Sequence, residues 1–170
     1  MKDNFRKLDV LSIKDNVFKL IGDDWMLITS GNLQSYNTMT ASWGFMGILW
    51  NKPIAVCFIR PQRYTLDFVE KNEYFTLSFF SEKYRKALEF CGSRSGRDWD
   101  KAKETGLTPI LTDTGNVTFS QARLVLECHK LYADTIREEN FILKELVLKN
   151  YPGKDFHRFF LGEVVSVYTK

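Results

Sequence analysis

The chain has 170 residues, of which 44% are hydrophobic and 15% aromatic, a composition typical of a folded globular domain and not of a disordered chain. Its 24 Lys and Arg against 21 Asp and Glu give a net charge of only +3, and the charges are interspersed, which excludes the dense basic surface that nucleic acid requires. No apolar stretch approaches the length of a membrane span, and the N-terminus lacks the apolar core of a signal peptide. We therefore expect a single domain over residues 1–170, cytoplasmic, with no nucleic-acid or membrane partner.

The residues that most often bind metals are few and scattered. The three cysteines, Cys57, Cys91 and Cys128, are odd in number and lack metal-ligand spacing, which favours free thiols. Cys91 precedes a glycine at a predicted helix end, so a partly exposed, reactive thiol is an alternative there. The two histidines, His129 and His157, are far apart in sequence and have no acidic cluster beside them. We expect no metal site.

The first part of the chain predicts an arm, a short helix and a hairpin. Residues 1–13 resemble an arm with a short strand, and residues 14–21 a helix with Val17, Phe18 and Ile21 facing inward. Residues 25–30 form the first clear strand, and a polar turn at 31–36 leads to a strand-like segment at 39–42. The hairpin would place Thr29 and Ser30 beside the backbone of that segment.

The middle of the chain alternates short strands and helices. Residues 54–59 predict a strand that is buried on both faces, after which Pro61 lies near the first turn of a helix over residues 64–71. Leu66 and Val69 share one face of that helix. Residues 73–79 alternate strictly between large apolar and small polar side chains, which indicates a strand with one buried side.

The remainder predicts two more helices and a set of long strands. A helix at 84–90 ends at Gly92, and after a polar loop Asp98 is the expected N-cap of a helix that ends at Gly106. The further elements are a short strand at 107–113, a turn at 114–116, a long alternating strand at 121–132, a charged excursion at 133–153 with a small helix near 141–148, and a closing strand at 157–168. Many short strands without a βαβ rhythm favour an antiparallel barrel decorated with helices.

Two stretches have the chemistry of a binding site. Arg60, Arg63 and Thr65 lie where a strand leads into a helix, and guanidinium groups, a hydroxyl and a helix N-terminus together suit a phosphate. Two solvated arginines beside a turn are the plainer alternative. Residues 39–42 have short side chains, so their backbone N–H and C=O groups can reach the edge of a flat ligand.

These stretches also carry a family resemblance. The runs Asn-Thr-Met-Thr-Ala-Ser-Trp-Gly (37–44), Lys-Pro (52–53), Arg-Pro-Gln-Arg-Tyr-Thr (60–65), Phe-Thr-Leu-Ser-Phe-Phe (75–80), Cys-Gly-Ser-Arg-Ser-Gly-Arg-Asp (91–98), Asp-Lys (100–101), Thr-Gly-Leu-Thr-Pro (105–109) and residues 157–164 occur in this order. Together they resemble the flavin reductase-like family of FMN-binding split barrels, in particular its flavoredoxin-type branch. The resemblance implies a mainly β fold, an antiparallel, Greek-key type split β-barrel with peripheral helices. It also implies a homodimer with FMN near the subunit interface.

The resemblance assigns roles to residues in this sequence. The backbone of residues 39–43 would line the isoalloxazine edge, while Arg60, Arg63 and Thr65 would hold the phosphate. The loop after Gly92 would add Ser93 and Ser95, although a plain helix connection is an equal alternative from the residues alone. The full set of expected FMN-binding residues is Asn37, Met39, Thr40, Ala41, Ser42, Trp43, Arg60, Pro61, Arg63, Tyr64, Thr65, Ser93 and Ser95.

Three ring-bearing residues have two interpretations each. By resemblance His157 contacts the second substrate: its five-residue spacing to Gly162 is kept, although the Gly-Asp pair usual before that histidine is replaced by Asp-Phe. A lone histidine at a strand start is otherwise more often structural. Trp43 and Trp50 are stacking platforms or interface anchors in one interpretation, and barrel-core residues in the other.

Three functions follow from these expectations. The first is an FMN oxidoreductase of the flavin reductase class that passes electrons from NAD(P)H through tightly bound FMN to a small-molecule or protein acceptor. The second is a flavoredoxin-like electron carrier that a redox partner protein reduces. The third is a non-catalytic module for another phosphorylated planar ligand such as pyridoxal phosphate, or for haem, although histidine ligands are scarce.

Overall fold

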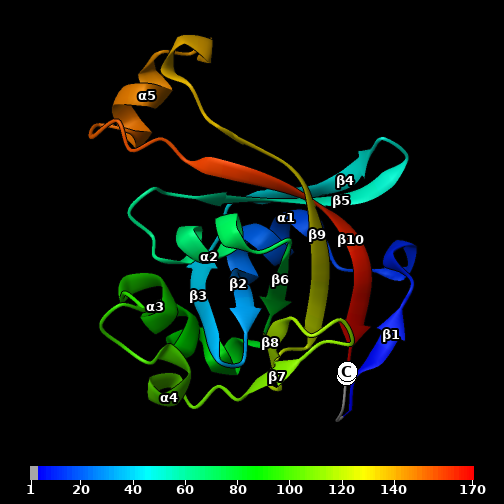
Figure 1. Ribbon diagram of the computed structural model, residues 1–170. Helices are drawn as coiled ribbons and strands as arrows, with labels where there is room; N and C mark the ends of the chain where they lie inside the picture. The colour runs from blue at the N-terminus through cyan, green and yellow to red at the C-terminus, as the bar shows by residue number, and fades with distance from the viewer. Residues whose placement is uncertain (1–3) are drawn as a thin grey trace.

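The computed structural model describes residues 4–170, and its central feature is an antiparallel sheet that curls into a barrel (Figure 1). The strand order is β3-β2-β6-β9-β10-β5-β4, and β1 pairs with β10. The strands are β1 (Arg6–Leu8), β2 (Met26–Asn32), β3 (Ser35–Ala41), β4 (Gly44–Leu49), β5 (Lys52–Ile59), β6 (Tyr74–Phe79), β9 (Leu124–Thr135) and β10 (Arg158–Thr169), with β7 (Pro109–Leu111) and β8 (Val117–Phe119) as a separate hairpin. The expected antiparallel split barrel is confirmed.

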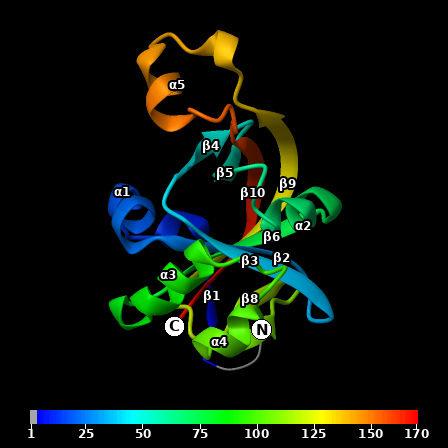
Figure 2. The ribbon, with the colours of Figure 1, turned by 90° about the vertical axis from the view of Figure 1, so that its left-hand side faces the viewer.

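Short helices surround the barrel. They are α1 (Val17–Lys19), which continues into a wide π turn at Leu20–Asp24, α2 (Thr65–Lys71), α3 (Arg85–Ser93), α4 (Lys101–Thr105) and α5 (Glu145–Asn150), with single 3₁₀ turns at Val10–Ser12, Glu82–Tyr84 and Glu138–Asn140. Figure 2 shows α3 and α4 on one side of the barrel and α5 projecting away from it at the end of β9. None of the helices in residues 4–170 has the length and apolarity needed to cross a membrane.

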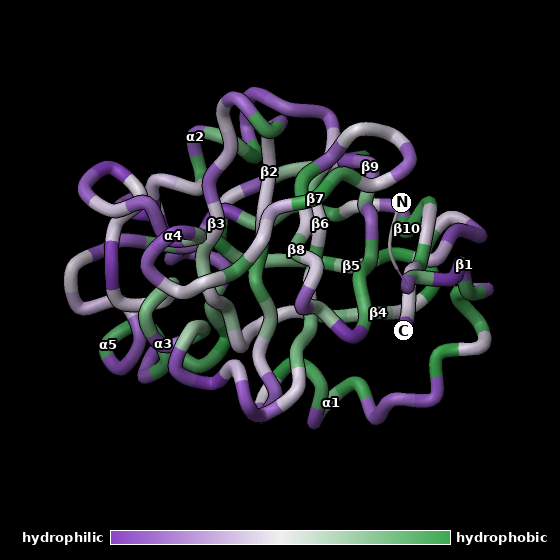
Figure 3. Tube along the Cα trace, turned by 90° about the horizontal axis from the view of Figure 1, so that it is seen from below, coloured by the Kyte–Doolittle hydropathy of each residue, from purple (hydrophilic) through white to green (hydrophobic). Residues whose placement is uncertain are grey.

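Both faces of the β2–β6–β9 region are buried. Inside the barrel lie Met26, Ile28, Met39, Phe75, Leu77, Leu126, Cys128 and Phe160, and between the sheet, α3 and the β7–β8 hairpin lie Leu27, Leu88, Cys91, Phe119, Val125 and Tyr168. In Figure 3 hydrophobic stretches follow the inner strands, whereas hydrophilic stretches gather in outer loops and helices such as α4. Gly162 allows close packing inside the barrel, because a Cβ atom there would lie 2.7 Å from both Phe75 and Cys128.

Several local predictions were wrong for identifiable reasons. Phe18 is 90% exposed, because α1 has only three residues before the π turn and a 3.6-residue period is not maintained. Asp100, not Asp98, caps α4, since its carboxylate accepts from the Lys103 N–H at 3.1 Å. Pro61 lies in a separate turn before α2.

Other differences concern burial. The polar face of residues 73–79 is also buried, because the β7–β8 hairpin covers it and Thr76 donates to the Val117 carbonyl at 2.7 Å. Cys91 is fully buried and burial raises its thiol pKa to about 11, so the alternative of a reactive thiol is wrong. The small helix expected near 141–148 is displaced to α5.

The hairpin between β4 and β5 has no counterpart in the predicted elements. Its turn uses Trp50 and Asn51, both with positive φ of 52° and 56°, as a type I′ turn requires. The predicted hairpin between β2 and β3 is present, with Thr29 opposite Thr38 and Ser30 opposite Asn37. Its register therefore sets residues 39–41 opposite Met26–Ile28, not opposite Thr29 and Ser30.

Candidate functional site

The site is organised along β3, an edge strand of the sheet. Thr38 lies opposite Thr29, with their hydroxyl oxygens 2.8 Å apart, and its carbonyl points away from β2, where it accepts a hydrogen bond from Lys101 at 2.7 Å. Antiparallel strands alternate in this respect, so Thr40 also turns its backbone N–H and C=O toward the outer edge. A ligand lying beside β3 can therefore be bound by the main chain.

Three segments that are far apart in sequence meet at this edge. The Asn37 side-chain amide donates to the Thr65 hydroxyl at 2.8 Å, which joins β3 to the start of α2. The Arg63 guanidinium donates to the Gly92 carbonyl, and the Thr40 hydroxyl donates to the Leu88 carbonyl. The predicted segments 37–42, 60–65 and 92–96 are thus brought together.

Gly96 shows how closely the loop after α3 approaches β3. A Cβ atom at this position would lie 1.9 Å from the Asn37 side-chain oxygen. Since Asn37 is itself buried and bonded to Thr65, a larger residue at 96 would displace this amide. The loop and strand together form a tight cradle of backbone and small polar groups.

Lys101 supplies the site with a buried cation, and it was not among the expected site residues. Its side chain is 6% exposed, and its ammonium donates to the carbonyls of Thr38 at 2.7 Å and Cys91 at 2.9 Å. Among the described residues no carboxylate lies within ion-pair distance of it. Burial, the largest cause, acts together with the nearby charge of Arg63 to lower its pKa to about 8.

This cation and its neighbours line a polar cavity. The cavity measures about 390 Å³, and Asn37, Tyr64, Gly96 and Lys101 are among the residues that line it. A buried ammonium without an anionic partner is costly unless an anion binds to it. The only sequence signal for Lys101 was its place directly after Asp100 in the family-like Asp-Lys pair.

Arg60 is engaged elsewhere. Its guanidinium forms an ion pair with Asp155, donates to the Asn150 carbonyl at 2.8 Å and lies 5.2 Å from the centre of the Tyr151 ring. Hydrogen bonds from Arg60 and Gln62 lower the pKa of the Asp155 carboxyl. Arg60 therefore holds the loop after α5 against the end of β5, with its charge balanced by Asp155.

The remaining predicted residues of the loops make local contacts. Ser93 donates to the Phe90 carbonyl within α3, and the Ser95 hydroxyl accepts from the Arg97 N–H at 3.1 Å. The Tyr64 ring lies under the Arg97 guanidinium, 4.3 Å away. Met39 and Ala41 turn their side chains into the barrel core, so only their backbone is available to a ligand.

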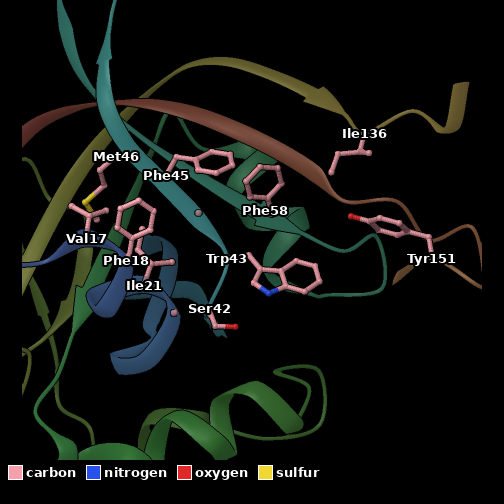
Figure 4. A pocket seen from close by; sticks show the side chains of 12 residues that line it. Val17, Phe18, Ile21, Ser42, Trp43, Phe45, Met46, Phe58, Ile136 and Tyr151 are labelled. Carbon is pink, nitrogen blue, oxygen red and sulfur yellow. The ribbon is translucent and has the colours of Figure 1, made fainter. Parts of the chain in front are cut away.

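A second, apolar cavity of about 720 Å³ begins where β3 ends. Two of the residues expected to bind FMN, Ser42 and Trp43, line it. The other lining residues were not among the expected site residues, and they are Val17, Phe18, Ile21, Gly22, Gly44, Phe45, Met46, Phe58, Ile136 and Tyr151. Figure 4 shows Phe18 and Met46 at one end, Tyr151 and Ile136 at the other, and Phe45, Phe58 and Trp43 between them. Trp43 is 48% exposed and Trp50 59%, so neither is a core residue.

His157 is buried beside three of the rings that line this cavity. Its ring centre is 5.1 Å from that of Trp43 and 6.3 Å from that of Phe58, and its Nδ1 is 2.8 Å from the Tyr151 hydroxyl. Burial, followed by the charge of Arg60, lowers its pKa to about 4. His157 is consequently uncharged at neutral pH. His129, by contrast, stacks on Tyr74 at 4.8 Å, away from this cavity.

Fold and site together define a class: a split-barrel protein with a polar cradle that contains a buried ammonium, and with an apolar cavity, along one strand edge. Residues 20–170 match the family model described as flavin reductase like domain. The chain belongs to the flavin reductase-like domain family, which supports a flavin-related redox function.

Solved structures agree with this fold. An FMN-binding protein from Thermus thermophilus with bound p-hydroxybenzaldehyde is 23% identical with a TM-score of 0.68, over 86% of this chain and 71% of that one. Flavoredoxin from Methanosarcina acetivorans is 20% identical with a TM-score of 0.67, over 86% and 68% of the two chains. An NADH:FAD oxidoreductase from Streptomyces globisporus, in complex with NAD and FAD fragments, is 18% identical with a TM-score of 0.62, over 86% and 74%. No functionally curated protein matches the sequence.

Proposed function

We propose that this protein binds FMN and is an oxidoreductase that passes electrons from NAD(P)H through FMN to an acceptor. The observation that carries the proposal is that a polar cradle with an unpaired buried cation and an apolar cavity lie at the two ends of one strand edge. Asn37 and Ser42 are five residues apart, about 17 Å along an extended strand. This separation suits a ligand with a phosphate at one end and a flat ring at the other. The Thermus and Streptomyces neighbours, which bind FMN and fragments of NAD and FAD, are consistent with it.

The cradle would hold the phosphate. Arg63 and Lys101 offer charged donors and the Thr65 hydroxyl a neutral one, and Gly96 allows the loop to approach Asn37 closely. Each of these groups is held by a carbonyl or amide of another segment, so little ordering is needed on binding.

The end of β3 would hold the ring. The backbone of Thr40 and Ser42 borders the ring edge, and N–H groups there stabilise negative charge that develops on reduction. Bound FMN would supply the redox chemistry itself. Trp43 and the neutral His157 would form the wall against which a second substrate lies.

An absorbance spectrum tests this function directly. The purified protein, supplemented with FMN if needed, is titrated anaerobically with NADH and then NADPH. Flavin bands that bleach with either donor support the reductase, and the more effective donor is the preferred one. A colourless protein that does not bind added FMN would refute the proposal.

A second function is favoured by the composition of the apolar cavity. None of its described lining residues is Lys or Arg, so the lining itself offers no cation to the diphosphate of a nicotinamide dinucleotide. An FMN electron carrier reduced by a partner protein needs no such cation, and two of the structural neighbours are flavoredoxins. Bound FMN that NADH and NADPH fail to bleach, but that a reducing partner protein does, would select this function.

We also propose that the protein is a homodimer. Five apolar side chains of the β4–β5 hairpin, α1 and the segment before α1 are more than half exposed, namely those of Leu11, Phe18, Phe45, Ile48 and Trp50. Together they expose on the order of 600 Å² of apolar surface, near what one side of a standard interface buries. Sedimentation equilibrium should give twice the chain mass of 19.9 kDa, and Ile48→Glu should halve it. Leu111→Glu, on the distant β7, is the matched control, and a monomeric wild type would refute the dimer.

A further inference from the structure

The polar cavity at the cradle is larger than a phosphate requires. It measures about 390 Å³. A phosphate group has about the volume of two or three water molecules, whose share of the liquid is ~30 Å³ each, so it would fill roughly a quarter of this space at most. FMN ends at its phosphate, and its ring would lie toward Ser42. Most of the cavity therefore has no occupant in the proposed FMN complex.

The open part of the cavity extends away from the ring end of β3. Beyond Asn37 the cavity is lined by residues 33–36, which form the turn between β2 and β3 and the first residues of β3. β3 leads from this turn to the apolar cavity (Figure 1). The Asn32 side chain accepts the N–H groups of Gln34 and Ser35, both at 3.0 Å, so the turn has a fixed shape before any ligand binds. A ligand that continues past the phosphate would enter this part.

Trp99 provides a flat apolar surface in the wall of the cavity. It lies two residues before Lys101, whose ammonium is fixed by two carbonyls, and it is 43% exposed. Its ring meets that of Phe90 at right angles with 5.8 Å between their centres, and the Arg94 guanidinium lies over it at 5.7 Å. These contacts hold the ring in place. Leu33, which is equally exposed, lines the same cavity from the turn.

Polar groups in the same cavity suit a sugar and a second phosphate. The Asp100 carboxylate and the Gln34 side-chain amide line it. Asp100 uses one oxygen to cap α4, and in the described part of the chain its other oxygen accepts no hydrogen bond, so it can accept one from a hydroxyl. Arg97 lies 4.3 Å from the centre of the Tyr64 ring at the cavity wall, and its ion pair with Asp67 is half exposed and therefore weak. A flat ring, a hydroxyl acceptor and a cation are what a nucleotide requires.

We propose that the open part of this cavity is a nucleoside subsite in which Trp99 stacks on the base of a flavin dinucleotide, so that the protein binds FAD more tightly than FMN. The inference rests on the proposed function, because the flavin ring and its phosphate would lie as they do for FMN. The nucleoside of FAD would continue from that phosphate toward the β2–β3 turn. Stacking of a base on an aromatic ring is worth roughly 5- to 150-fold in affinity.

Isothermal titration calorimetry of the flavin-free protein with FMN and with FAD tests the proposal. We expect FAD to bind about tenfold more tightly than FMN, and Trp99→Ala to remove that difference while the FMN affinity stays the same. Trp99→Phe keeps an aromatic face and should restore most of the difference. An unchanged FMN affinity also reports that the cradle is intact in each variant.

A matched control is available on another part of the barrel. Tyr132→Ala removes a ring of β9 that is 45% exposed and lines neither cavity, and it should leave both affinities unchanged. The inference is overturned if FAD binds no more tightly than FMN to the wild type, or if Trp99→Ala keeps the preference or weakens both flavins equally. In each of these cases FMN still binds and the proposed function stands, whereas a protein that binds neither flavin refutes the proposed function itself.

Discussion

The two ends of the β3 edge are built on opposite principles. At the cradle, Asn37, Arg63 and Lys101 are each fixed by hydrogen bonds to groups from other segments. At the apolar cavity, aromatic and aliphatic faces meet, and within residues 4–170 the hydrogen bond between the Tyr151 hydroxyl and His157 Nδ1 is the one that joins two ring side chains there. The cradle has a smaller cavity of about 390 Å³, beside which loop and strand approach closely at Gly96, whereas the apolar cavity of about 720 Å³ is bordered by exposed rings.

This difference indicates that the two ends have separate tasks: the cradle determines how tightly FMN binds, and the apolar cavity determines which second substrate is aligned. An anion is held by a few charged donors in fixed positions, where a small displacement loses most of the energy. An apolar cavity derives its affinity from area and tolerates many flat occupants, so a single polar group determines which of them is aligned. We expect changes in the cradle to alter FMN affinity and changes at the cavity to alter turnover.

The largest effect on FMN affinity is expected from a substitution in the polar cradle. Arg63→Ala removes a charge-assisted contact to phosphate and should weaken FMN binding by about 1.5–3 kcal/mol. Arg60→Ala is the matched control, because Arg60 is already paired with Asp155, and it should weaken binding less. Fluorescence titration with FMN measures both, and an unchanged affinity in a folded Arg63→Ala protein would reject the phosphate assignment.

A smaller effect is expected from closing the cradle sterically. Gly96→Ala places a Cβ atom where the Asn37 side-chain oxygen lies, which breaks the bond from Asn37 to Thr65 and should cost about 1–2 kcal/mol of FMN affinity. Gly153→Ala meets only an ordinary contact at 3.8 Å and is the control. Equal titration curves for the two variants would show that Asn37 does not shape the phosphate site.

The pH dependence of affinity tests the buried cation. The pKa of Lys101 is lowered to about 8, so the FMN-free protein loses this charge as pH rises through 8, and affinity should fall by at most about tenfold per pH unit above it. Lys101→Met should bind FMN more weakly and show no such fall.

The stability of the FMN-free protein should change with pH in the opposite direction to the FMN affinity. The free energy of unfolding should rise between pH 8 and the ordinary lysine pKa of 10.5, because the unfolded chain binds one proton more than the folded chain in that range. If the wild-type affinity for FMN does not change between pH 7.5 and 9.5, the assignment of Lys101 to the phosphate site is rejected.

The sequence predicted one end of the site far better than the other. Motif residues such as Asn37, Arg63 and Thr65 are recognisable because anion binding uses few residue types at short spacings. Lys101 was overlooked because lysines are rarely buried and composition does not reveal burial. The apolar cavity was largely missed because Phe18, Phe45 and Tyr151 belong to separate elements, and only the fold brings them together.

Prediction of the strands and helices from the sequence has the same limit. Strands with strict alternation, such as β6 and β9, were located to within a few residues. β4 was missed because Gly44 and Gly47 interrupt its pattern and its type I′ turn uses Trp50 and Asn51 without a glycine. Phe18 was misplaced because the π turn after α1 is not visible in a hydrophobic period. Local patterns predict regular segments, whereas irregular turns depend on tertiary packing.

The smallest expected effect on FMN binding is at His157. This residue also gives the clearest test of whether the two ends of the β3 edge have separate tasks. His157→Ala leaves Arg63, Thr65 and Lys101 in place, so FMN affinity should change by less than ~0.5 kcal/mol, within the range of substitutions that lose no direct contact. Reduction by NADH or NADPH should nevertheless slow, because Trp43 loses the imidazole ring on which it packs at the wall of the cavity. Stopped-flow bleaching of the flavin bands, with His129→Ala as the control, measures the rate separately from the affinity. Loss of FMN from His157→Ala would mean that this ring belongs to the flavin pocket, and binding and selection would then share the apolar end.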